Sequence, residues 1–302
     1  MTLIRKAYAK VNLFLNIVGK RPDGYHELET IFEKISLHDD VVLSRRRDSR
    51  IVVTCSDSAL SGDENLCHKA ARLFAEETSL DCGFDIHIEK RIPKAGGLGG
   101  ASADAAAVLC GLNDLTACGL SEERLGALAA KLGSDVNFFL TDAPFALGTG
   151  RGEIITPIYS KKVFHHILVL GHEESSTPSV FKRFTLKDNR AGAVDAFVEY
   201  LKAGKGDLPA ELLFNALTEP YLAQSSKAPG MFAELDAAGE TFVLSGSGAT
   251  INVMVPAPTY ELSGLLSARL AEYGASIVHA STVQPEGHHG SYRDQDCPQG
   301  CI

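Results

Sequence analysis

The sequence has few basic residues and no long apolar run. Its 302 residues include 29 Lys and Arg against 38 Asp and Glu, which gives a formal net charge of −9. Nucleic acids and anionic membranes bind surfaces with the opposite excess, so this balance argues against both as partners. No apolar stretch approaches the ~20 residues that span a bilayer, and residues 1–6 lack the apolar core of a signal peptide. We therefore expect a cytoplasmic protein without a membrane segment.

Cysteine pairs with the spacing of a metal or redox site are also absent. The cysteines number 7, which is odd, and no Cys-x-x-Cys occurs, so neither a zinc knuckle nor a thioredoxin-type site is supported. Reduced thiols in a cytosolic protein are the simplest interpretation. Cys297 and Cys301 lie near His288 and His289, a combination that can suggest metal. However, residues 286–302 show no periodicity, and we expect them to form a mobile tail.

What the sequence does contain is the pattern of a two-domain protein of alternating strands and helices. With 45% apolar and 22% charged residues it is an ordinary globular chain, and ~300 residues usually divide into two domains. Residues 7–18 alternate between apolar and polar side chains, which predicts a strand that presents Lys10, Asn12 and Asn16 on one face. Residues 21–24, Arg-Pro-Asp-Gly, predict a turn. The other elements predicted in the first half are strands at 27–36, 41–44, 51–55 and 84–89, helices at 64–77, from the glycine-rich segment to about 112, and at 121–132, a short apolar element at 136–140 and a turn at 148–152.

The second half has its own order of elements. Leaving small helices aside, the order is β-α-β-β-α-β, which is the ferredoxin-like arrangement. We predict an N-terminal domain over residues 1–158 and a C-terminal domain over 159–285, with the tail at 286–302. The predicted strands are 166–170, 241–245, 250–255 and 276–283, and the predicted helical regions are 177–184, 194–202, 211–238 and 259–271.

A glycine-rich segment connects a predicted strand to a predicted helix at residues 93–104, Pro-Lys-Ala-Gly-Gly-Leu-Gly-Gly-Ala-Ser-Ala-Asp. Backbone N–H groups at such a helix N-terminus can hold phosphate, and glycine permits both positive φ and a close approach of the ligand. No Gly-Lys-Ser/Thr follows the glycines, so this is not a Walker A loop. Nor does a ribose-binding acid follow a second strand, as a dinucleotide-binding fingerprint requires. By itself, the segment is equally typical of a tight structural connection.

Three stretches together resemble the GHMP kinases. They are residues 9–13 (Ala-Lys-Val-Asn-Leu), 93–104 and 244–249 (Leu-Ser-Gly-Ser-Gly-Ala), in that order, and the likeness covers residues from about 4 to 283. The resemblance implies an α+β protein with the two-domain GHMP kinase fold. It has an N-terminal mixed α/β domain that carries the nucleotide loop, a C-terminal ferredoxin-like domain, and an active site in the cleft between them.

Four segments narrow the resemblance to one branch of these kinases. They are residues 10–15, 21–26, 97–106 and 132–136, and the most distinctive part is Asp-Gly-Tyr-His at 23–26. That branch uses ATP to phosphorylate the 2-hydroxyl of a methylerythritol unit carried on cytidine diphosphate, in the non-mevalonate route to isoprenoid precursors.

The resemblance implies that Lys10 and Asp135 are the catalytic residues. Asp135 matches the family's catalytic aspartate, which accepts the hydroxyl proton, and Lys10 matches the lysine beside that carboxylate. Phosphoryl transfer needs positioning, charge neutralisation and an aligned hydroxyl, all of which such a pair serves. Taken alone, Lys10 is better explained as a solvated strand lysine and Asp135 as a helix cap, and the matched motifs reverse that preference.

The cytidine part of the substrate needs an aromatic stacking partner and hydrogen bonds at the edge of its base. The resemblance implies that Tyr25 stacks on cytosine, that His26 reads its edge, and that Phe181 supplies a second aromatic ring. Phe181 also precedes Phe184 at helical spacing and can belong to the core. The other predicted substrate-binding residues are Asn12, for which a structural amide is the alternative, Thr177, Gly246, Ser247 and Gly248.

The expected ATP site consists of the glycine-rich loop, the helix that follows it, and Asn65. Asn65 either contacts adenine, as the resemblance implies, or caps the helix predicted at 64–77. Ser102 either binds phosphate or Mg²⁺ or caps the helix. Asp104 either has a metal role or is simply a carboxylate that the positive end of the helix stabilises. Relatives carry serines at the positions of Gly100, Ala101 and Ala103, so we assign Mg²⁺ to the nucleotide and name no protein ligand. The predicted ATP-binding residues are Pro93, Lys94, Ala95, Gly96, Gly97, Leu98, Gly99, Gly100, Ala101, Ser102, Ala103 and Asn65.

Two other functions fit parts of the pattern. Another small-molecule GHMP kinase, of the homoserine or mevalonate type, would consume ATP without needing cytidine. A non-catalytic module that binds a nucleotide or RNA would not need Lys10 and Asp135, and the acidic net charge weakens the RNA version. We expect ATP with Mg²⁺ as cofactor, a small-molecule cytidine diphosphate substrate, no nucleic-acid or membrane partner, and a monomer or weak homodimer.

Overall fold

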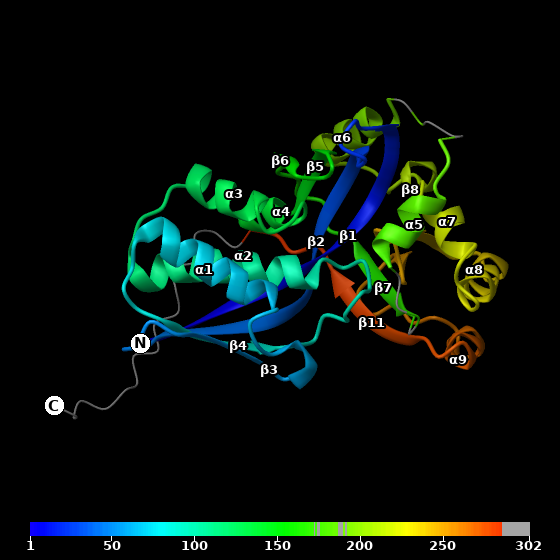
Figure 1. Ribbon diagram of the computed structural model, residues 1–302. Coiled ribbons are helices and arrows are strands. Elements are labelled where there is room, and N and C mark those ends of the chain that lie inside the picture. Colours follow the sequence, from blue (N-terminus) through cyan, green and yellow to red (C-terminus); the bar gives the residue numbers. More distant parts are fainter. Residues whose placement is uncertain (172, 174–175, 187–189, 191, 286–302) are drawn as a thin grey trace.

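The computed structural model describes residues 1–285 except 172, 174–175, 187–189 and 191 (Figure 1). Within these residues the strands form two sheets. The larger has the order β3-β4-β2-β1-β8, with β5 paired to β2 and β6 paired to β5, and the smaller has the order β11-β7-β10-β9. None of the described helices is long and apolar enough to cross a membrane. The predicted tail, with its paired cysteines and histidines, lies outside the described residues.

Two long antiparallel strands, β1 (Thr2–Lys20) and β2 (His26–Arg45), form the centre of the larger sheet. The turn between them is the predicted one, because Gly24 has a φ of +88° and its N–H donates to the Arg21 carbonyl at 3.1 Å. β2 joins two runs that were predicted as separate strands. Its polar residues His38 and Asp39 continue the pairing with β1, so the chain stays extended there.

A β-bulge in β1 changes which side chains share a face. Asn12 pairs with Phe32 and Phe14 with Ile31, which leaves Leu13 as an extra residue between them. The extra residue reverses the alternation beyond it. As a result Leu15 lines the same cavity as Lys10 and Asn12, whereas Asn16 does not. The prediction that Asn16 shares their face is therefore wrong.

Helices cover one face of the larger sheet (Figure 1). Large apolar side chains of the sheet, such as Leu43 and Ile86, are buried against Phe74 and Leu109 of the helices. Each such side chain contributes about 1.5–3 kcal/mol when it is fully buried. The remaining elements of the first half are β3 (Ile51–Cys55), β4 (Phe84–Glu89), β5 (Phe145–Gly150), β6 (Ile154–Ile158), a 3₁₀ turn at Ser58–Leu60, α1 (Leu66–Thr78), α2 (Gly100–Thr116), α3 (Glu122–Ala130) and α4 (Val136–Leu140).

The smaller sheet has the predicted β-α-β-β-α-β order, and its strand order is that of a ferredoxin-like domain. The predicted helical region at 211–238 is broken, because Asn215 donates to the Leu244 and Gly246 carbonyls and holds a short strand there. The predicted helix at 259–271 starts later, since the Ser263 hydroxyl caps it by accepting the Leu266 N–H. The elements are β7 (His165–Leu170), α5 (Thr177–Arg183), α6 (Ala193–Ala203), a 3₁₀ turn at Ala210–Leu212, β8 (Phe214–Asn215), α7 (Thr218–Leu222), α8 (Ala228–Ala237), β9 (Thr241–Leu244), β10 (Thr250–Val255), α9 (Gly264–Glu272) and β11 (Ser276–Ser281).

Elements of the predicted second domain contact the first, and β8 and α6 are among them. β8 pairs in parallel with β1 through Phe14 and Phe214, and Phe197 of α6 belongs to the same core cluster as Phe145 of β5. The predicted boundary between residues 158 and 159 falls in the connection from β6 to β7. Because the chain crosses back later, the domain division stays a prediction.

A buried polar contact ties the two sheets together. His166 of β7 lies with its Nε2 2.9 Å from Oε1 of Glu33 on β2, and the Thr282 hydroxyl donates to the same oxygen at 2.6 Å. The side chains of Glu33 and His166 are both 0% exposed. Since a buried carboxylate is stabilised only by its partners, this contact fixes how the sheets meet.

Replacing His166 with leucine is expected to lower the free energy of unfolding by about 3–5 kcal/mol, because it removes a donor from a buried carboxylate. Urea denaturation measures the loss. The matched control is His165→Leu, one residue away, where the ring is partly exposed and contacts the Ser281 hydroxyl at 2.8 Å. Its expected cost is about 1 kcal/mol or less. If the two variants lost the same free energy of unfolding, the contact of His166 with Glu33 would not stabilise the fold more than an ordinary surface contact does.

Candidate active site

Two cavities meet at the glycine-rich loop. The first, of about 480 Å³, lies over the start of α2 and is lined by residues 93–102 together with Asn65. The second, of about 870 Å³, lies between the β1–β2 hairpin, α5 and residues 246–247. Gly97 and Gly99 line both cavities. Groups bound in the two cavities would therefore face each other across this loop.

The glycines of the loop are required by the fold as well as by any ligand. Gly97 and Gly99 have φ values of +74° and +71°. A Cβ at Gly97 would lie 2.2 Å from the Ser245 carbonyl oxygen, and one at Gly99 would lie 2.8 Å from the Phe139 ring. Gly99 also occupies the N-cap of α2 without a side-chain cap. The positive end of this helix is therefore open to an anion in the first cavity.

Lys10 lines the second cavity next to Gly99, where the two cavities meet. Its side chain is 5% exposed, and its Nζ lies 3.6 Å from Oδ2 of Asp135 and donates to Oδ1 of Asn12 at 2.5 Å. Its backbone N–H donates to the Leu98 carbonyl at 3.0 Å, which ties β1 to the glycine-rich loop. Burial lowers the pKa of Lys10, and the carboxylate of Asp135 opposes this effect. The interpretation of Lys10 as a solvated strand lysine is therefore wrong.

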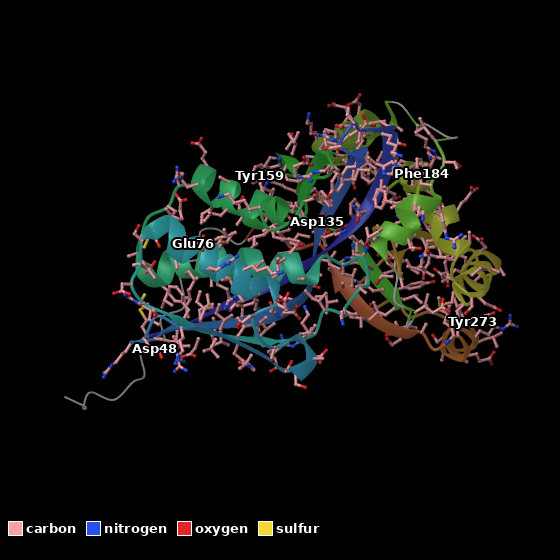
Figure 2. All side chains as sticks on the ribbon, in the orientation of Figure 1. Asp48, Glu76, Asp135, Tyr159, Phe184 and Tyr273 are labelled. Atoms are coloured by element: carbon pink, nitrogen blue, oxygen red, sulfur yellow. The ribbon has the colours of Figure 1, made fainter. Side chains whose placement is uncertain are left out.

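Asp135 occupies the N-cap position of α4, but its side chain does not cap the helix. The structure gives it no side-chain hydrogen bond to the helix N-terminus, and its side chain, 32% exposed, is directed to Lys10 instead. Figure 2 shows Asp135 near the middle of the molecule. The helix-cap alternative is wrong, and the carboxylate is free to accept a proton from a group in the second cavity.

Asn12 is held in place by hydrogen bonds on both ends of its amide. Oδ1 accepts from Lys10, and Nδ2 donates to the Thr30 hydroxyl at 2.7 Å. Thr30 in turn donates to the Phe14 carbonyl. Asn12 also lines the second cavity, so the structural role and the predicted contact with substrate are compatible. Its local effect is to fix the ammonium of Lys10.

Aromatic side chains form the far end of the second cavity. Tyr25 is 56% exposed, and the His26 ring lies 5.3 Å from that of Phe181 and 5.9 Å from that of Phe184. Phe181 also packs against the core of the smaller sheet, so both interpretations of this residue apply. Burial, with a smaller effect of Lys20, lowers the pKa of His26. A neutral His26 can both donate and accept at the edge of a base.

The other predicted substrate-binding residues also line the second cavity, with one exception. Thr177 at the start of α5 and Ser247 place their hydroxyls 2.8 Å apart, and Gly246 lies beside them in the cavity lining. Gly248 lines neither cavity. A Cβ there would lie 2.7 Å from the Tyr221 ring, so its role is packing.

The predicted ATP-binding residues line the first cavity, apart from Ala103. Ala103 is 2% exposed and belongs to the core. Asn65 caps α1 by accepting the Cys67 N–H at 2.8 Å while its Nδ2 donates to the Leu60 carbonyl, so the cap interpretation is confirmed. Ser102 lies inside α2, whose cap is Gly99, so the interpretation of Ser102 as a cap is wrong.

Asp104 forms a buried ion pair beneath the loop. Its Oδ2 lies 3.0 Å from Nζ of Lys90, which also contacts Asp39. Burial raises the pKa of Asp104, while Lys90 acts in the opposite direction. Among the described residues no group of three or more His, Cys, Asp or Glu side chains could hold a metal ion. Lys90 therefore holds Asp104 in place at the first cavity, which Asp104 also lines.

Three basic residues of the second cavity were missed by the sequence reasoning. They are Lys20, Arg151 and Lys182, which join Lys10 in the lining, where the acidic residue among the described ones is Asp135. Each stands next to a predicted feature: Lys20 before the Arg-Pro-Asp-Gly turn, Arg151 between two glycines, and Lys182 after Phe181. Their positions next to these features could have predicted that they line the cavity. A protein of net charge −9 thus gathers cations where a phosphorylated ligand would lie.

Comparison with known proteins gives consistent results. The sequence profile of the GHMP kinases N terminal domain matches residues 65–148. A 4-diphosphocytidyl-2-C-methyl-D-erythritol kinase of Rhodococcus jostii is 39% identical over 259 residues, which are 82% of each chain. The enzyme of the same name from Leifsonia xyli is 38% identical over 289 residues, 90% of this chain and 92% of that relative.

Solved structures agree with this assignment. A crystal structure of 4-(cytidine 5'-diphospho)-2C-methyl-D-erythritol kinase superposes with a TM-score of 0.76 at 30% identity, over 93% of this chain and all of that one. A homoserine kinase from Cytophaga hutchinsonii, at 14% identity, has a TM-score of 0.73 over 94% of this chain and 95% of its own and shows the fold alone. These findings confirm the two-domain GHMP kinase fold that the three motifs predicted. The chain belongs to the 4-diphosphocytidyl-2-C-methyl-D-erythritol kinase family of the GHMP kinases.

Proposed function

We propose that this chain transfers the γ-phosphoryl group of ATP to the 2-hydroxyl of 4-diphosphocytidyl-2-C-methyl-D-erythritol, in non-mevalonate isoprenoid precursor biosynthesis. The observation that carries the proposal is the pair of Lys10 and Asp135, 3.6 Å apart, at the junction of two cavities. One cavity suits a nucleoside triphosphate whose phosphates lie over a helix N-terminus. The other has an aromatic end and a set of cations, which suits a cytidine diphosphate derivative.

The proposal gives each residue at the junction a role. The carboxylate of Asp135 accepts the proton of the acceptor hydroxyl as that oxygen attacks the terminal phosphorus atom. The ammonium of Lys10, held by Asn12, keeps Asp135 ionised and stabilises the charge that develops on the transferred group. The first N–H groups of α2 hold the phosphates of ATP. Mg²⁺, carried by the nucleotide, neutralises phosphate charge when it is bound.

The family assignment makes the chain a small-molecule kinase, as the sequence predicted, and the alternative of a non-catalytic binding module is rejected. The described cysteines are free thiols, which supports a reducing compartment such as the cytoplasm. The expected monomer or weak homodimer stays a prediction.

An assay of ATP consumption with a panel of alcohols tests the function. The cytidylated methylerythritol substrate should support turnover in the presence of Mg²⁺, whereas homoserine and mevalonate should not. Turnover of the methylerythritol compounds should also require the cytidine group. Equal rates with and without cytidine would contradict the proposed substrate and favour another kinase of the superfamily.

Replacing Tyr25 with alanine is expected to raise KM for the cytidylated substrate by roughly 5- to 150-fold, which corresponds to the ~1–3 kcal/mol of one stacked base. The reason is that its exposed ring, 56% accessible, offers a face to cytosine. Steady-state kinetics with each substrate varied in turn measure the change, and KM for ATP should stay constant. Tyr159→Ala is the matched control, since Tyr159 is also exposed and lines neither cavity. An unchanged KM in the Tyr25 variant would refute the stacking role.

A further inference from the structure

Two turns that are far apart in the sequence meet through Arg151 and Tyr25. The guanidinium carbon of Arg151 lies 4.8 Å from the centre of the Tyr25 ring, so the planar cation covers part of the ring. Tyr25 belongs to the β1–β2 turn, where its N–H donates to Asp23 at 3.1 Å. Arg151 belongs to the β5–β6 turn. Tyr25 is thus fixed at its backbone by its own turn and at its ring by the other.

The turn that carries Arg151 is closed by its own hydrogen bonds and comes close to Asp135. Gly150 and Gly152 on either side have φ values of +71° and +98°, and the Arg151 N–H donates to the Glu153 side chain. A Cβ at Gly152 would lie 4.0 Å from Oδ1 of Asp135. Arg151 therefore lies between the aromatic end of the cavity and the site of phosphoryl transfer.

The guanidinium retains capacity for a ligand. Among the described residues its ion-pair contact is a long one, from Nε to Oε1 of Glu153 at 3.4 Å. Its side chain is 34% exposed and lines the second cavity. An arginine fork with free terminal N–H groups binds phosphate oxygens in a bidentate manner, and stacking on a ring leaves those edge groups available.

We propose that Arg151 determines specificity for the diphosphate of the substrate, by pairing its terminal N–H groups with the phosphate oxygens while its flat face holds the ring of Tyr25. The inference rests on the proposed function, because it takes cytosine to lie at Tyr25 and the acceptor hydroxyl at Asp135. The diphosphate links these two parts of the ligand. It must therefore pass the position that Arg151 occupies.

Calorimetric titration with two probes, cytidine and CDP, tests the proposal without any turnover. Arg151→Gln should weaken CDP binding roughly ten- to thirtyfold, as expected for a charge-assisted bidentate contact, and weaken cytidine binding by less than about threefold. Arg151→Lys, which keeps the charge but loses the fork, should fall between Arg151→Gln and wild type for CDP. In steady-state assays, KM for the cytidylated substrate should rise while kcat and KM for ATP stay within about twofold.

Arg72→Gln on α1 is the control for the loss of one positive charge, because Arg72 is exposed and lines neither cavity. It should leave both affinities unchanged. Equal weakening of cytidine and CDP by Arg151→Gln would overturn the inference, because Arg151 would then act only through Tyr25. Unchanged CDP binding in that variant would overturn it as well. A wild-type protein that binds neither probe would overturn the proposed function and this inference with it.

Discussion

Replacing Asp135 with asparagine is expected to lower kcat by about 10²–10⁴-fold, the range that a general base contributes, with both KM values within about threefold of wild type. The amide keeps the size of the side chain but cannot accept the hydroxyl proton. Because Asp135 is 32% exposed and does not cap α4, its replacement should leave the fold intact. Steady-state kinetics on purified variants, together with thermal unfolding, measure both effects.

The size of the loss distinguishes two roles for Asp135. A general base gives the full loss, and the acidic limb of the pH profile of kcat disappears with it. A carboxylate that mainly positions Lys10 by charge gives a loss closer to tenfold. Asp114→Asn is the matched control, since that carboxylate pairs with Arg5 at the surface and should leave kcat unchanged. Near-normal turnover of the Asp135 variant would exclude it as the base.

Local patterns in the sequence predicted most of the secondary structure of this chain. Alternation gave β1 and β4, the Arg-Pro-Asp-Gly turn was placed correctly, and the helix predicted at 121–132 begins where Ser121 caps α3. These features depend on neighbouring residues, which a single sequence displays directly. The bulge at Leu13 was missed because pairing with another strand creates it. Nothing in the alternation of β1 indicates where that partner shifts register.

The candidate site was predicted through motifs, and the contacts within it could not be. The resemblance named Lys10 and Asp135, but their separation of 3.6 Å results from tertiary packing, in which α4 lies against α2 and its Phe138 stacks on Phe32 of β2. The contact of Glu33 with His166 was not foreseen, since each residue sits in an apolar strand without a local partner. Arg151 was placed in a turn, and only the structure shows that this turn faces Tyr25. Contacts between residues so far apart in the sequence can be predicted only once the fold is known.

Replacing Lys10 with methionine is expected to lower kcat by about 10²–10³-fold, the loss that follows removal of one donor to a developing negative charge. Lys10 is buried and touches Asn12 and Asp135 at the junction of the two cavities. Methionine fills a similar space without charge. Since burial lowers the pKa of Lys10, the charged form is costly in the fold. Removing that cost opposes the loss of the hydrogen bond to Oδ1 of Asn12, so the free energy of unfolding at pH 7 should stay within about 1–2 kcal/mol of wild type.

The lowered pKa of Lys10 also sets the direction of the pH dependence. A lysine whose pKa lies below 10.5 in the folded protein loses its proton at a lower pH than a free one, so kcat should fall on the alkaline side before pH 10.5 is reached. Lys10→Arg, which stays charged, should have lower activity but an alkaline limb displaced to higher pH. An alkaline limb that is identical in wild type and Lys10→Arg would contradict the role of the ammonium. In that case, if Lys10→Met is inactive but as stable as wild type, altered packing against Phe32 would have to explain the loss of activity. The centre of the Phe32 ring lies 5.5 Å from Nζ of Lys10.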